Sequence, residues 1–137
     1  MKRFLLCLML APAILAAAEA PLPERAKVSQ ERGAQWLMKQ QLEDGSFALD
    51  PRMSDLGITA LATTALAKSG HADSPQVQKA VSYLLKNVHD DGSIYAEDGR
   101  GLYNYRTSVS LMALSAVDPI KHRDVIKKAQ DYLAGTQ

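Results

Sequence analysis

Apolar positions recur every three or four residues after Ser74, which is the spacing of an amphipathic helix with one buried face. Ser74 is suited to cap the start of this helix, and Pro75 fits the first helical position because that position needs no N–H donor. The residues expected to be buried are Val77, Ala80, Val81, Leu84, Leu85 and Val88. The opposite face is polar, so we expect an outer helix with one wet side.

A second kind of helix is expected after Asp55, because its apolar residues are spread around most of the circumference. Asp55 is the expected N-cap, and Gly70 is the expected C-terminal stop. The apolar residues are Ile58, Ala60, Leu61, Ala62, Ala65, Leu66 and Ala67. We therefore expect an inner helix that neighbouring elements cover on nearly every side.

Two further helices are expected towards the C-terminus. One inner helix should run from about Asn104 to Val117, where Asp118 and Pro119 end it. The last outer helix should start near His122 to Asp124 and bury Val125, Ile126, Ala129, Tyr132 and Leu133. No segment alternates with period two for long enough to predict a strand, so the expected fold class is all-α.

The helices belong to a repeat of about 48 residues, seen when the sequence is compared with itself. "RGAQWLMKQQLEDGSF" (32–47) aligns without a gap with "KAVSYLLKNVHDDGSI" (79–94), and a third copy begins at Lys128. "TALATTALA" (59–67) aligns in the same way with "TSVSLMALS" (107–115). Each unit therefore reads as an outer helix, a glycine-containing turn and an inner helix. The acidic pairs Glu43-Asp44 and Asp90-Asp91 are interpreted as turn residues rather than as catalytic acids.

The repeated residues resemble the QW motif of the terpenoid-cyclase and protein-prenyltransferase superfamily. The first copy is formed by Arg32, Gly33, Trp36, Leu37, Gln41, Gly45 and Phe47. The second is formed by Lys79, Ala80, Tyr83, Leu84, Gly92 and Ile94, and the third by Lys128, Ala129, Tyr132, Leu133 and Gln137. Ile94 replaces the closing aromatic residue and Val88 replaces the glutamine, so the chain is more similar to the degenerate bacterial prenyltransferase and squalene-oxidase repeat proteins than to the cyclases.

The resemblance implies an α/α toroid, in which outer and inner helices alternate around a ring. Residues 28–137 would form an incomplete part of it, because about two and a half helix pairs leave an apolar flank uncovered. We expect an N-terminal fragment of a longer protein; the alternative is a ring completed by association of several copies.

The first 18 residues are expected to form a cleaved signal peptide. Lys2 and Arg3 precede an apolar stretch that is too short for a membrane span, and small residues follow it. Cleavage is expected after Ala18, with Ala20 as the rival site, and residues 19–27 would be a linker. The expected location is periplasmic or secreted, with no stable membrane span after cleavage.

The amino-acid composition limits which kinds of chemical site the mature chain can contain. The only cysteine, Cys7, lies in the signal peptide, so disulfides and thiolate metal sites are excluded from the rest. The remaining 14 basic and 15 acidic residues give a formal charge of −1, which provides no reason to expect a nucleic-acid partner. His89 beside Asp90 and Asp91 lacks the ligand spacing of a zinc site. We predict neither a metal nor a cofactor.

The resemblance implies that a catalytic member would carry an Asp-x-Asp-Asp motif, because cyclases of the superfamily use this motif to protonate an alkene. That motif does not occur here, so no catalytic residue is predicted. The remaining candidates precede or begin an inner helix: Arg100, Tyr103, Tyr105 and Arg106. They could stack on a sugar or hold an anion near the helix N-terminus. The alternative is that the tyrosines pack under a turn while both arginines are solvated.

Two functions follow from these expectations. The first is a toroid that binds a small molecule, a glycan or a protein, with no catalytic residues in this segment. The alternative is an enzyme of the same fold, similar to a terpenoid cyclase or a polysaccharide lyase, with its active site in further repeats. A fold alone does not decide between them.

Overall fold

A computed structural model describes residues 21–50, 55–98 and 100–136. Within these residues the regular elements are helical: α1 (Leu22–Met38), α2 (Leu56–Leu66), α3 (Pro75–Leu85), α4 (Tyr103–Val117) and α5 (Arg123–Gly135). A short π-helical turn, η1 (Ala67–His71), continues α2. The described residues form isolated β-bridges but no strand. The predicted all-α class is confirmed, and the expected signal peptide lies outside the described residues.

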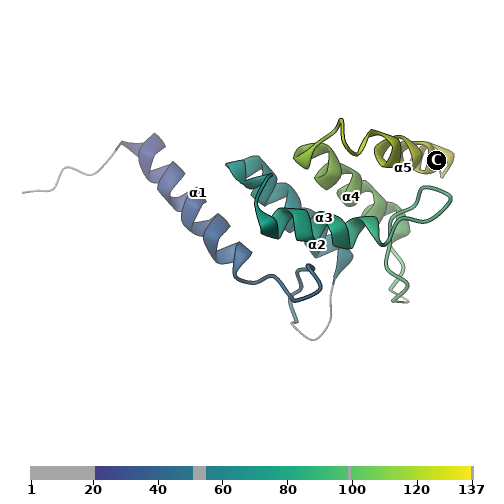
Figure 1. Ribbon diagram of the computed structural model, residues 1–137, viewed down its shortest axis with the longest axis horizontal. Coiled ribbons are helices and arrows are strands. Elements are labelled where there is room, and N and C mark those ends of the chain that lie inside the picture. The colour runs from purple at the N-terminus through teal and green to yellow at the C-terminus, as the bar shows by residue number, and fades with distance from the viewer. Residues whose placement is uncertain (1–20, 51–54, 99, 137) are drawn as a thin grey trace, which may run out of the picture.

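The two inner helices, α2 and α4, pack closely against each other in the middle of the molecule. α3 contacts both of them, α1 flanks α2, and α5 flanks α4 (Figure 1). Most of the fully buried large side chains come from α2, α3, α4 and the turns that precede the two inner helices: Phe47, Leu56, Leu66, Val77, Leu84, Ile94 and Leu114. Outer and inner helices therefore alternate along the chain, as expected.

The cap of α2 is as predicted, because Oδ1 of Asp55 accepts a hydrogen bond of 3.0 Å from the Ile58 N–H. Gly70 has a φ of 91°, which breaks the helical geometry after α2. The expectation that α2 is covered on nearly every side is wrong for one side. Leu61 is 44% exposed and Ala65 is also exposed, because none of the described neighbours of α2 covers these residues.

The cap of α3 is also as predicted, since the Ser74 hydroxyl accepts a hydrogen bond of 3.3 Å from the Val77 N–H. Its expected apolar face is buried at Val77, Ala80, Val81 and Leu84. Leu85 and Val88 are only half-buried. Val88 lies beyond the helix end at Leu85, where it forms an isolated bridge with Ile94.

The terminal helices are less buried than the central ones. In α5, Ala129 is buried, whereas the other predicted core residues, Val125, Ile126, Tyr132 and Leu133, are half-buried. α5 packs on α4 along one side, which explains this difference. α1 begins at Leu22, inside the segment 19–27 that was expected as a linker, and residues 21–33 are exposed. The first part of α1 therefore adds nothing to the core.

The two glycine-containing turns make the same hydrogen bonds. In the first turn the Leu42 N–H donates to the Ser46 carbonyl, and in the second the His89 N–H donates to the Ser93 carbonyl, both at 2.9 Å. The following residue then donates its N–H to a threonine on the next inner helix. Phe47 bonds Thr59 Oγ1 at 2.8 Å, and Ile94 bonds Thr107 Oγ1 at 2.9 Å. Each turn is thereby fixed to the start of the inner helix that follows it.

The glycine of each turn lies against the backbone of the next outer helix. A Cβ added at Gly45 would lie 2.6 Å from the carbonyl oxygen of Lys79, and one at Gly92 would lie 2.4 Å from that of Lys128. Both glycines also have positive φ values, +92° and +88°. A residue without a side chain is therefore required at both positions.

Replacing these glycines should destabilise the protein. Gly92→Ala combines left-handed backbone strain with a clash against the Lys128 carbonyl, so we expect a loss of about 2–4 kcal/mol in the free energy of unfolding. Urea denaturation measures this loss.

Two matched variants separate strain from clash. Gly70→Ala has the strain without the contact, since nothing lies within 4 Å, and should cost about 1–2 kcal/mol. Gly33→Ala lies inside α1 with open space around it and should stabilise by roughly 0.5–1 kcal/mol. An effect of Gly92→Ala no larger than that of Gly70→Ala would contradict the close backbone contact.

Candidate functional site

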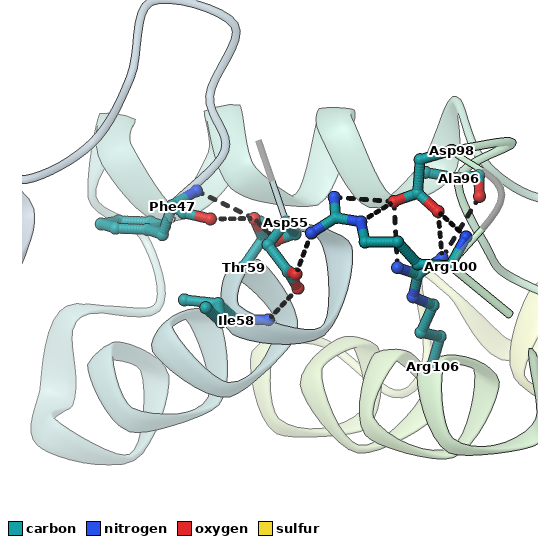
Figure 2. Close-up of polar contacts among 8 residues, drawn as sticks. All are labelled: Phe47, Asp55, Ile58, Thr59, Ala96, Asp98, Arg100 and Arg106. Atoms are coloured by element: carbon teal, nitrogen blue, oxygen red, sulfur yellow. Dashed lines mark hydrogen bonds and ion pairs between the residues drawn. The ribbon is translucent and has the colours of Figure 1, made fainter. Parts of the chain in front are cut away.

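Arg106 is the buried centre of a polar cluster at the N-terminal ends of the two inner helices. It lies in the first turn of α4 and is only 3% exposed. Its Nη1 and Nη2 donate to the two carboxylate oxygens of Asp98 at 2.8 and 2.9 Å, and Nη1 also bonds the Ala96 carbonyl at 3.3 Å (Figure 2). The paired hydrogen bonds compensate the buried charge.

Arg100 connects this pair to the neighbouring inner helix. Its Nε donates to Oδ2 of Asp98 at 2.8 Å, and its Nη1 donates to Oδ2 of Asp55 at 2.9 Å (Figure 2). Asp55 is at the same time the N-cap of α2. Four side chains, Asp55, Arg100, Asp98 and Arg106, therefore form one ionic chain, here called the ionic bridge, from the start of α2 to the start of α4.

The ionic bridge borders a pocket of about 220 Å³. Apolar or uncharged residues complete its wall, and the full lining consists of Asp55, Gly57, Ile58, Arg100, Leu102, Tyr105 and Arg106. Leu102 has a left-handed backbone with a φ of 61° and is 66% exposed, and Tyr105 is 49% exposed. The site thus offers an accessible aromatic ring beside fixed charged groups.

The arginines hold Asp98 in its charged form. Hydrogen bonding from Arg106 is the main cause that lowers the pKa of Asp98 from its ordinary value of 3.8 to about 2, against the opposing effect of burial. Asp98 in turn raises the pKa of the Arg106 guanidinium. Asp98 is therefore a hydrogen-bond acceptor at neutral pH and holds no proton to donate.

The structure brings three of the four predicted site residues to the pocket: Arg100, Tyr105 and Arg106. Tyr103 belongs to a different group. Its ring lies 4.3 Å from that of Tyr95, which stacks on His89 at 3.9 Å. Whether these residues bind a ligand stays a prediction.

The alternative interpretation, in which both arginines are solvated, is wrong for Arg106, because Asp98 and Ala96 hold its guanidinium inside the protein. Asp98 and Asp55 were not among the predicted site residues. The spacing of Asp98 just before Arg100 was the available signal, since an aspartate can bond the backbone two residues later, as it does here at 3.1 Å.

The second acid of each turn pair has a structural role, in agreement with the interpretation of these pairs as turn residues. Asp44 accepts hydrogen bonds from the backbone and hydroxyl of Ser46 at 3.0 and 2.6 Å. Asp91 does the same for Ser93 at 2.9 and 2.5 Å, and the Ser93 hydroxyl is the main cause that lowers the pKa of Asp91. Among the described residues, no group of three His, Cys, Asp or Glu side chains is placed to hold a metal ion.

The remaining histidines lie outside the pocket lining. His71 pairs with Glu31 of α1 at 3.0 Å and links α1 to the turn after α2. His122 is buried before α5, and burial is the main cause that lowers its pKa. No helix in the described ranges is both long and apolar enough to cross a membrane.

Two comparisons with known proteins both relate this chain to squalene-hopene cyclases. The family model of the squalene-hopene cyclase C-terminal domain matches residues 46–137. A squalene–hopene cyclase of Bradyrhizobium diazoefficiens is 31% identical over an alignment of 132 residues, and the match covers 78% of this chain. The match spans only 19% of that relative's length. No solved structure matches the chain.

Removal of the Asp98 charge should destabilise the protein. Asp98→Asn leaves the buried Arg106 guanidinium without its ionic partner. We expect the free energy of unfolding to fall by about 2 kcal/mol at neutral pH, which is less than for a fully buried ion pair because Asp98 is partly exposed. The control is Asp124→Asn, whose side chain is 91% exposed and should be nearly neutral.

The pH dependence tests the same pair. Because the pKa of Asp98 is lowered on folding, its contribution is complete above the ordinary value of 3.8 and is lost as pH falls towards about 2. Urea midpoints measured across this range should fall more steeply for the wild type than for Asp98→Asn. Parallel curves for the two proteins would contradict the assignment.

Proposed function

Since the chain belongs to the squalene-hopene cyclase C-terminal domain family, we propose that it is a cyclase-like helical repeat protein that binds a ligand at the ionic-bridge pocket without catalysing a reaction there. The observation that carries the proposal is the state of the two acids of the ionic bridge, Asp98 and Asp55. A general acid must hold its proton at the working pH. Arg106 keeps Asp98 ionised, and Asp55 is engaged by Arg100 and by the α2 backbone.

The pocket favours a glycan among the possible ligands, which otherwise include other small molecules and proteins. Tyr105 offers an exposed ring face that a sugar can cover with its C–H groups. The fixed carboxylate and guanidinium groups of Asp55 and Arg100 offer acceptors and donors at the same border for sugar hydroxyls. These groups are already positioned, so binding requires little ordering of side chains.

A second candidate is favoured by the named relative, which is a squalene–hopene cyclase. In that case this segment would support an enzyme whose active site lies in other repeats. Incubation of the full-length protein with squalene, followed by mass spectrometry of the products, separates the two. Conversion of squalene would overturn a purely binding role, whereas unchanged squalene together with saturable glycan binding supports it.

Substitution of Tyr105 should weaken glycan binding. We expect Tyr105→Ala to raise the dissociation constant about fivefold, because a stacked aromatic ring contributes on the order of 1 kcal/mol. The probes are tetra-N-acetylchitotetraose, which is neutral, and tetragalacturonate, which is anionic, both titrated by calorimetry. Ser82→Ala on the exposed side of α3 is the matched control. Binding that is unchanged by Tyr105→Ala, or absent for both probes, would count against the glycan proposal.

We also propose that the protein is exported to the periplasm or secreted after cleavage of residues 1–18. Expression in a Gram-negative host should give a mature chain that begins at Glu19, or at Pro21 if the rival site is used. N-terminal sequencing of the protein from the periplasmic fraction measures this directly. A chain that retains Met1 would overturn the proposed location.

A further inference from the structure

A second depression lies beside Trp36 and is larger than the ionic-bridge pocket. This Trp36 groove has a volume of about 410 Å³ and is formed by α1, the first turn and the start of α2. Its lining contains no charged residue and consists of Trp36, Leu37, Gln40, Leu42, Phe47, Ala48, Leu49 and Ile58. Trp36 is 64% exposed, so its indole is accessible from solvent. The volume lies within the range of roughly 300–1,000 Å³ that is usual for small-molecule sites.

The second turn shows which residues occupy the equivalent positions. Phe47 and Ile94 both donate their N–H to the threonine of an inner helix, which makes Ala48 equivalent to Tyr95. Leu42 and His89 both donate to the serine carbonyl of their turns. Gln40 and Asn87 both donate their side-chain amide to a carbonyl four residues earlier, at 3.3 and 2.9 Å. The two regions therefore share one backbone register with different side chains.

Two side chains of the second region, an aromatic ring and a cation, have no counterpart in the first region. In the second turn the Tyr95 ring stacks on His89 with an angle of 13° between the planes. In the first turn Ala48 has only a methyl group at the equivalent position, beside Leu42. Ile58 precedes Thr59 as Arg106 precedes Thr107, so the buried guanidinium of the second repeat is also replaced by an apolar group. The first repeat thus lacks the ring and keeps an uncharged groove there.

We propose that the Trp36 groove binds a small, neutral aromatic ligand of about the size of a phenol ring. The ring takes the place that Tyr95 fills in the second repeat, packed against Leu42 and the Trp36 indole. Aromatic rings gain from such apolar and aromatic neighbours. The lack of charged lining disfavours an ionic ligand, because an ion would lose its hydration without a partner. Gln40 is the polar group that lines the groove.

The test uses p-cresol, which is the tyrosine side chain as a free molecule. Trp36 is the chain's single tryptophan, so its indole N–H gives one assignable proton–nitrogen NMR signal. Titration of the full chain with p-cresol should shift this signal in a saturable way. Nuclear Overhauser contacts should link the p-cresol ring to the Ala48 methyl group. Absence of a saturable shift, or contacts elsewhere only, would overturn the proposal.

Variants at position 48 test the proposed place of the ring. Ala48→Tyr supplies the ring covalently and should weaken p-cresol binding at least about tenfold, whereas the matched variant Ala48→Ser keeps the groove open and should bind as the wild type does. Unchanged binding by Ala48→Tyr would contradict the site. Hexan-1-ol serves as an apolar probe without a ring, and equal affinity for it would contradict the aromatic preference. If Ala48→Tyr does not fold, the nuclear Overhauser contacts between p-cresol and the Ala48 methyl group of the wild type still test the proposed site.

Discussion

The structure depends on the contact between each turn glycine and the carbonyl of the next outer helix. The carbonyl of Lys79 lies where a side chain at Gly45 would be, and the carbonyl of Lys128 lies where a side chain at Gly92 would be. This contact fixes where the outer helix lies relative to the turn, and the threonine hydrogen bonds fix where the inner helix begins. The N-terminal ends of α2 and α4 are thereby held in position. Arg100 can then bond Asp55 at the start of α2, and Asp98 can bond Arg106 at the start of α4.

The ionic bridge shows why a charged residue near a pocket is not automatically a ligand-binding group. The Arg106 guanidinium is nearly inaccessible, and its Nη1 and Nη2 donate to Asp98 and the Ala96 carbonyl, so its role is to hold Asp98. Asp98 then positions Arg100, which is more exposed. Desolvation of the buried arginine is compensated only because both carboxylate oxygens meet it. Arg100 of the ionic bridge and the neighbouring Tyr105 are more accessible to solvent than Arg106.

The sequence predicted the features that depend on near neighbours. The caps at Asp55 and Ser74 are set by bonds to residues three positions later, and the apolar spacing of α3 is set by the helix period. The bond between Arg100 and Asp55 joins residues 45 positions apart, and no local pattern encodes such a contact. Burial of Arg106 was missed for the same reason, since an arginine in a first helical turn is ordinarily solvated. The uncovered side of α2 could not be predicted either, because it depends on which elements lie beside the helix.

Different side chains on one backbone register give two surfaces with different chemistry. After the second turn, Tyr95 and Arg106 supply an aromatic ring and a buried guanidinium, whereas Ala48 and Ile58 make the corresponding positions after the first turn apolar. Ile58 borders both depressions, so the ionic-bridge pocket and the Trp36 groove meet at the start of α2. The shared hydrogen bonds of the turns keep the backbone the same at both places, which frees these few positions to differ. The different chemistry of the two depressions therefore comes from side chains at equivalent positions of the turns and inner helices rather than from changes in the path of the chain.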